Sequence, residues 1–243
     1  MIKFFRHIRR NLIESRKTAK YLKYAIGEIL LVVIGILIAL QINNWNENRK
    51  ASDMGKQFLS GIQEDLKKDL VRIDSIVTMN AQSISLITSI DSVFHRKHYF
   101  YTDQNEKFFN QPDTINFQHV FYRDMSFRSI KGNYKSLIAD GKTGLIKNKE
   151  LFQALQLIYD ENQARLSSTY DAIKAIEQNI SWAYGYEKYN WTYSDLKNAK
   201  DKKIFLDLVN FTEQKYWHAL NLLRTKNNSA KVIAMIEKEL AND

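Results

Sequence analysis

The chain has 243 residues, 36 Lys or Arg against 27 Asp or Glu, a formal net charge of +9, and no cysteine. The lack of cysteine excludes disulfides, thiolate nucleophiles and cysteine-ligated metals, so a folded core must hold through packing alone. The charge does not indicate nucleic-acid binding, because residues 46–243 hold 28 basic and 25 acidic residues, a balance of only +3.

Residues 1–24 form a short basic segment with eight Lys or Arg and one acidic residue, Glu14. Apolar side chains recur in this segment at helical spacing, which indicates an amphipathic helix lying on anionic lipid headgroups. A disordered basic tail is the alternative. Because positive charge is retained on the cytoplasmic side of a membrane, the segment predicts a cytoplasmic N-terminus.

Residues 25–45 are predicted to form a transmembrane helix. Fourteen of the eighteen residues in 25–42 are apolar, and a helix of that length covers ~27 Å, close to the hydrocarbon thickness of a bilayer. A buried helix of a soluble protein rarely stays apolar on every face for so long, and no signal-peptide cleavage site follows the run. Trp45 is expected to anchor the outer interface. Residues 46–243 would then form a domain outside the cytoplasm.

Small and polar residues share one stripe of this helix. At ~100° per residue, Gly27, Glu28, Gly35 and Ala39 fall on the same side. Small residues let helix backbones approach closely in lipid, so the stripe is a candidate interface with a second copy or a partner span. Three roles remain open for Glu28, namely placement near the inner interface, an ion pair with a partner span, and proton or ion coupling.

The segments Met1–Arg6, Tyr24–Ile29 and Val33–Glu47 carry a resemblance to a known family. They closely resemble the opening of small single-span envelope proteins of Gram-negative bacteria, catalogued as domain of unknown function 6090. A weaker likeness covers Tyr134, Leu137, Gly141, Leu145, Ile146, Asn148, Leu151 and Tyr159. The resemblance implies a bacterial inner-membrane location with a periplasmic helical domain. It brings no activity and no catalytic residues.

The remaining chain predicts long helices. Apolar residues from Leu59 to Phe94 recur about every 3.5 residues, with polar gaps at Asn80 and Asp91, which predicts a helix of about forty residues with a coiled-coil or bundle seam. Gly55 and Gly61 leave open whether this helix continues the transmembrane one. Residues 95–125, which are rich in aromatic residues, predict a loop and a candidate recognition surface.

The tetrad Gly141–Gly144 resembles part of a phosphate-binding loop, but the required earlier glycine is Ser136 here. A helix C-terminal turn with Gly141 in the left-handed conformation is the preferred interpretation. Asn148 is predicted to cap the following helix, which Glu150 suits at its positive end.

Aromatic residues are dense near residues 182–193, and Trp182, Tyr186 and Trp191 are the candidate recognition residues. They could stack on sugars or peptides, and packing over one end of the bundle is the alternative. Residues 201–240 predict a last long helix, which the polar run 226–229 could bend or break.

Together these patterns predict an all-α protein with one N-terminal transmembrane helix followed by an elongated antiparallel helical bundle. No catalytic motif appears, the pair His95 and His98 lacks further metal ligands, and acidic residues scattered among lysines indicate solvated helix faces. We therefore expect no enzyme activity, cofactor or metal.

The expected function is a scaffold or interaction subunit of an envelope complex, as a homo-oligomer or with other membrane proteins. Two alternatives are a periplasmic ligand sensor that signals through a partner span and an energy-coupled accessory subunit that uses Glu28.

Overall fold

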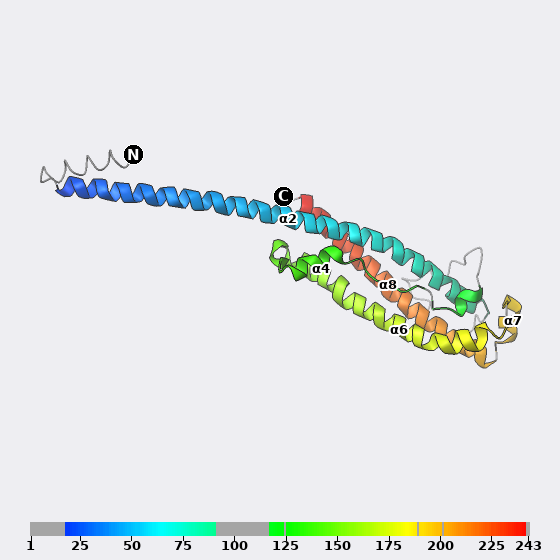
Figure 1. The fold of residues 1–243 in the computed structure, drawn as a ribbon. Coiled ribbons are helices and arrows are strands. Elements are labelled where there is room, and N and C mark those ends of the chain that lie inside the picture. Colours follow the sequence, from blue (N-terminus) through cyan, green and yellow to red (C-terminus); the bar gives the residue numbers. More distant parts are fainter. Residues whose placement is uncertain (1–17, 91–116, 124, 189, 201, 242–243) are drawn as a thin grey trace. The chain divides into compact units, whose positions relative to one another are not determined.

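The computed structural model describes residues 18–90, 117–123, 125–188, 190–200 and 202–241 (Figure 1). Every regular element among them is a helix, which confirms the all-α prediction. The chain divides into two compact units, Met1–Gly55 and Lys56–Asp243. The predicted amphipathic segment in residues 1–17 lies outside the described residues, as do Asp91, Phe94, the histidine pair and most of the predicted loop.

Helix α2 (Thr18–Ile90) contributes residues to both units. It continues through Gly55 and Gly61, so the two helices predicted on either side of these glycines are one element. Its apolar stretch contains an 18-residue window with a mean hydropathy of 2.6, of which no residue is buried. Among the described residues, α2 is thus the one helix long and apolar enough to cross a membrane.

The second unit is an antiparallel helical bundle. The later part of α2 lies beside α6 (Gln163–Ile180) and α8 (Lys203–Ala241) (Figure 1). Gln63 donates to Glu237 at 2.9 Å and Lys226 donates to Asp74 at 2.5 Å, so residue numbers rise along α2 as they fall along α8. The short helices are α4 (Gly132–Ala139), α5 (Lys149–Gln156) and α7 (Tyr193–Asn198). Single-turn elements are the 3-10 turns η2 (Phe117–Val120) and η3 (Thr143–Leu145) and the π-helical turns η4 (Leu157–Asn162) and η5 (Ser181–Gly185).

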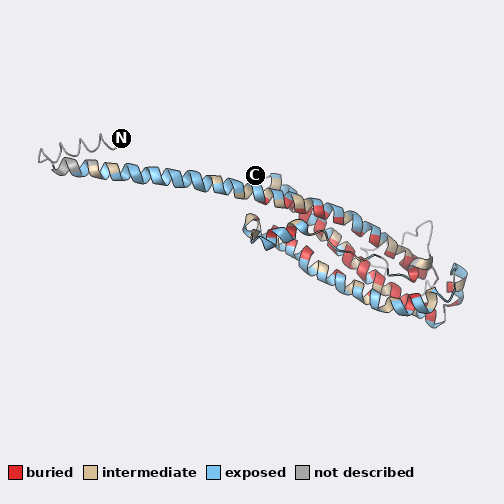
Figure 2. Cartoon of the chain, viewed as in Figure 1, coloured by how far each residue is buried: buried red, intermediate tan, exposed pale blue. Residues whose placement is uncertain are grey.

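Buried side chains line the facing sides of these helices (Figure 2). The apolar stripe predicted for α2 is confirmed, because it supplies buried residues to the core: Leu59, Ile62, Leu66, Ile73, Ile84 and Ile87. Two large apolar clusters occupy the ends of the bundle, and a small one around Ile73, Phe127 and Leu222 lies between them. One expectation was wrong, since Asp65 and Asp69 are buried rather than on a solvated face.

The predicted helix ends between α4 and α5 are confirmed. Gly141 has φ 66°, and the next amide, of Lys142, donates to the Leu137 carbonyl at 3.0 Å, as in a glycine-terminated helix. The side chain of Asn148 accepts from the Leu151 amide at 3.1 Å, and its own amide group donates to Glu239 at 3.1 Å. The cap of α5 therefore also ties this helix to α8.

Helix α8 is continuous, so the bend or break considered at residues 226–229 does not interrupt it. Two features explain why this polar run stays helical. Ser229 is buried within the bundle, and Lys226 is paired with Asp74 of α2. These tertiary contacts keep the run helical although it lacks the apolar periodicity by which a helix is recognised in a sequence.

The described residues between η2 and α4 have no regular secondary structure. We call residues 121–123 and 125–131 the strap. The strap inserts Phe121 into one end cluster and Phe127 into the central cluster. A non-helical segment therefore supplies two side chains to the core of a helical bundle.

Gly61 of α2 lies against the side chain of Asn133 of α4. A Cβ atom there would stand 2.6 to 2.8 Å from the amide group of Asn133, whose Nδ2 donates to Asp65 at 2.8 Å. We expect Gly61→Ala to displace Asn133 and lower the free energy of unfolding by about 1–2 kcal/mol, because the loss of a charge-assisted hydrogen bond outweighs the better helix propensity of alanine.

The measurement is thermal unfolding followed by circular dichroism, and Gly144→Ala is the control because no atom lies within 4 Å of that position. In an Asn133→Ala background, Gly61→Ala should become neutral or stabilising. An equal loss in both backgrounds would contradict this account.

Candidate functional site

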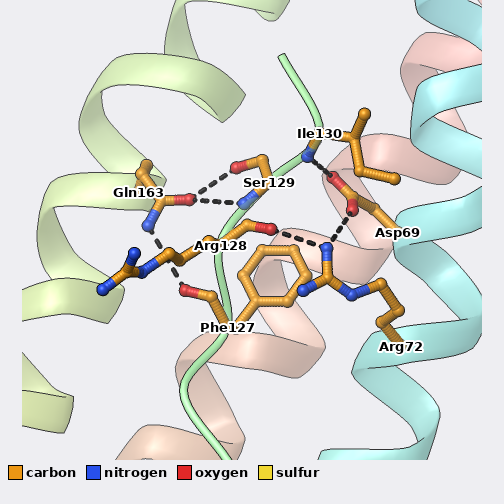
Figure 3. Close-up of polar contacts among 7 residues, drawn as sticks. All are labelled: Asp69, Arg72, Phe127, Arg128, Ser129, Ile130 and Gln163. Carbon is orange, nitrogen blue, oxygen red and sulfur yellow. Dashed lines mark hydrogen bonds and ion pairs between the residues drawn. The ribbon is translucent and has the colours of Figure 1, made fainter. Parts of the chain in front are cut away.

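The strap lies against the bundle without being helical, so its backbone polar groups cannot be satisfied within the segment itself. Side chains of α2 supply two of the missing partners (Figure 3). Asp69 accepts from the Ile130 amide at 3.0 Å, and Arg72 donates to the Arg128 carbonyl at 2.8 Å. Arg72 also pairs with Asp69 at 3.4 Å, so one acid and one base act as a unit.

Gln163 of α6 supplies the partners from the opposite side (Figure 3). Its Oε1 accepts from the Ser129 amide at 3.0 Å and from the Ser129 hydroxyl at 2.5 Å. Its Nε2 makes a longer contact of 3.5 Å with the Phe127 carbonyl. The backbone of residues 127–130 is therefore held from both α2 and α6.

The earlier part of the strap is fastened to the end of α6. The hydroxyl of Ser181 donates to the Phe121 carbonyl, and Arg123 forms an ion pair with Glu177. The Arg123 backbone amide donates to the same carboxylate at 3.2 Å. The strap consequently follows α6 over most of its length.

Asp69 is the most perturbed acid of this site. Burial raises its pKa to about 6, and the neighbouring carboxylate of Asp65 acts in the same direction. The Ile130 amide and Arg72 oppose this rise because they favour the charged form. From η4, the pKa of Tyr159 is raised by burial and by the two acids, and its hydroxyl has no hydrogen-bond partner within the described residues.

A hollow of about 410 Å³ lies between the strap and α6. We call it the strap hollow. Its lining residues are Ser126, Phe127, Arg128, Ser129, Lys131, Gln163, Ser167, Tyr170, Asp171 and Lys174. Three of these are cations and one is an acid, so the hollow is positively charged. Gln163, which holds Ser129, lines the hollow together with residues of the strap and other residues of α6.

A second polar residue, His218 of α8, is buried beside the middle of α6. Its Nδ1 lies 2.9 Å from the Thr169 hydroxyl, which itself lies within hydrogen-bond distance of the Arg165 and Leu166 carbonyls. This contact joins α6 to α8, and the imidazole tautomer sets which of the two groups donates. Burial lowers the His218 pKa to about 4, so this ring is neutral at pH 7.

Asp69 and His218 should affect stability in opposite directions over the same pH range. The Asp69 carboxyl binds its proton more tightly in the folded chain, where its pKa is about 6 rather than 3.8, so its contribution falls as pH rises from 4 to 6. His218 binds its proton more weakly in the folded chain, with a pKa of about 4 rather than 6.5, so its contribution rises with pH from 4 to 6.5. Each effect is on the order of 3 kcal/mol, so the two largely cancel.

We therefore expect the stability of Asp69→Asn to rise with pH across this range, because His218 then acts alone. The stability of His218→Gln should fall with pH, because Asp69 then acts alone. The measurement is the unfolding midpoint of the detergent-solubilised chain between pH 4 and 7. The unmodified chain supplies the baseline for all other titrating groups. Parallel curves for the two variants would contradict the assignment.

Gln163 provides a test of how the strap is held. Gln163→Ala removes the acceptor of the Ser129 amide, so hydrogen exchange of that amide should become at least tenfold faster. Gln153→Ala on the exposed face of α5 is the matched control and should leave strap exchange unchanged. Unchanged Ser129 exchange in Gln163→Ala would show that another group holds the strap.

The residues predicted from sequence lie in two other places. No atom lies within 4 Å of a Cβ atom built at Gly27 or Gly35, so the small-residue stripe has open space beside it. In the same unit the predicted anchor Trp45 is 64% exposed, with the Arg49 guanidinium 5.4 Å from its ring centroid.

The predicted aromatic surface divides into exposed and packed residues. Trp182 and Tyr186 are 75% and 72% exposed, and their ring centroids lie 5.9 Å apart. Trp191 is only partly exposed, because its ring lies 5.5 Å from that of Phe121 and its Nε1 donates to the Tyr184 carbonyl at 2.9 Å. The structure thus places Trp191 against the core and leaves the other two in solvent.

Sequence reasoning missed Asp69, Arg72 and Gln163. The one available signal was that Asp65 and Asp69 are four residues apart and directly precede Leu66 and Leu70 of the apolar stripe. Two acids beside a core face indicate buried partners, but those partners, Asn133 of α4 and Ile130 of the strap, are far away in sequence.

These helices define a class of protein. It is a helical bundle whose first described helix, α2, also contains an exposed apolar stretch suited to membrane association. The chain matches the model of the family of unknown function DUF6090 over residues 28–212, which is more than half its length. It therefore belongs to that family. Neither the curated proteins nor the solved structures contain a match to the chain.

Proposed function

We propose that this chain is a single-span membrane protein whose helical domain acts as a scaffold or interaction subunit of a bacterial envelope complex. The observation that carries the proposal is the apolar window of α2, which has a mean hydropathy of 2.6 and no buried residue. Exposing such a window to water is unfavourable, and insertion into a lipid bilayer removes its apolar side chains from water.

The direction of insertion follows from charge. The eight basic residues before the apolar run favour a cytoplasmic N-terminus and contact with anionic lipid headgroups, with residues 46–243 in the periplasm. A reporter fused after Asp243 should be active only outside the cytoplasm, and carbonate washing should leave the chain in the membrane fraction. Cytoplasmic reporter activity, or release by carbonate, would contradict this topology.

The stripe of Gly27, Glu28, Gly35 and Ala39 is the proposed helix–helix interface, because small residues permit close packing of spans. Since the chain contains no cysteine, a single introduced cysteine reports one position alone. Gly35→Cys and Ala39→Cys should crosslink in membranes several-fold more efficiently than Leu37→Cys, which at ~100° per residue lies on the opposite face.

Equal crosslinking at all three positions would exclude a specific interface. If Gly35→Cys and Ala39→Cys crosslink only to another protein, that protein is the complex partner and the chain is not a homo-oligomer. Glu28→Gln tests the energy-coupled alternative. If this variant still assembles and its phenotype is unchanged, the charge of Glu28 has no role in coupling.

A ligand sensor is the second candidate, and the strap hollow favours it. Hollows of this size between packed elements are where proteins hold small molecules. The sensor and the scaffold share the same membrane anchor and differ in whether the bundle recognises a small ligand.

A further inference from the structure

We propose that the strap hollow binds a small molecule carrying a carboxylate or phosphate group. The inference concerns the second unit alone and does not depend on how the chain is anchored, so it can fail while the membrane proposal stands. It deepens the sensor alternative by naming the chemistry of the ligand.

The first support is an excess of positive charge, because three cations line the hollow against one acid, Asp171. Arg128, Lys131 and Lys174 line the hollow, and none of them forms an ion pair within the described residues. Most other charges facing the strap are paired, such as Arg72 with Asp69 and Arg123 with Glu177. Three uncommitted cations around one concave surface attract and hold an anion.

The second support is the fixed position of the strap cations. Arg128 and Lys131 belong to a non-helical segment, yet their backbone is held by Arg72 at the Arg128 carbonyl and by Asp69 at the Ile130 amide. Figure 3 shows the Arg128 side chain extending toward α6 beside Gln163. A guanidinium with a fixed backbone can meet the two oxygens of a carboxylate or phosphate together.

The third support is the size and the mixed lining. A volume of about 410 Å³ admits a molecule of metabolite size rather than a folded partner. Phe127 and Tyr170 offer apolar surface, and Ser126, Ser167 and Asp171 offer hydrogen-bonding groups. The expected ligand therefore has one oxyanion group and a polar body with hydroxyl or amino substituents.

The test is isothermal titration of the full chain in a non-ionic detergent, with inorganic phosphate, citrate and glucose as probes at matched ionic strength. We expect saturable binding of at least one anion and none of glucose. Preference for phosphate assigns the ligand to phosphate esters, and preference for citrate assigns it to carboxylates. Absence of saturable binding by both anions overturns the proposal.

Three variants separate this site from general surface charge. Arg128→Gln keeps the backbone contacts of the strap and should weaken anion binding at least tenfold, and Lys174→Gln should weaken it several-fold. Lys231→Gln removes the same charge from an exposed position on α8 that does not line the hollow. The affinity of this variant for the anion should therefore stay within twofold of that of the unmodified chain. An equal loss in all three variants would reduce the binding to nonspecific screening and overturn the site.

Discussion

The strap depends on one constraint, that backbone packed against a helical bundle without being helical must find its hydrogen bonds outside its own segment. Residues 127–130 meet this constraint with side chains from two different helices. A buried polar group without a partner costs ~1–3 kcal/mol, so the bonds of the half-buried Ser129 and Ile130 amides to Gln163 and Asp69 favour the observed position of the strap. Phe127 adds the apolar contact that makes burial favourable, because it is only 4% exposed.

The core of the bundle is uneven. Apolar clusters fill its two ends, whereas the middle contains one small cluster together with buried polar residues such as Asp69, Asn80 and His218. Asp69 binds the strap, whereas Asn80 donates to the Ile76 carbonyl of its own helix and His218 contacts Thr169 of α6. The strap also supplies Phe127 to the central cluster, so it fills part of the middle of the bundle.

The sequence predicted those features that depend on near neighbours. The helical stripe from Leu59 to Ile87, the left-handed Gly141 and the cap at Asn148 are each determined within a few residues, and each is confirmed. The strap contacts could not be predicted in this way, because Asp69 and Ile130 are 61 residues apart and Gln163 and Ser129 are 34 apart. Periodicity reports which face of a helix is buried but not which distant backbone that face will meet.

Burial of Asp69 is unfavourable for the stability of the fold at neutral pH, since its raised pKa means that ionisation costs more in the folded chain than in the unfolded one. An apolar residue would remove that cost, but it would leave the Ile130 amide without a partner and Arg72 without its acid. Asp69 therefore holds the strap at Ile130 at a cost in stability. Ile130 lies between Arg128 and Lys131, so this contact fixes the backbone next to two of the cations that line the hollow.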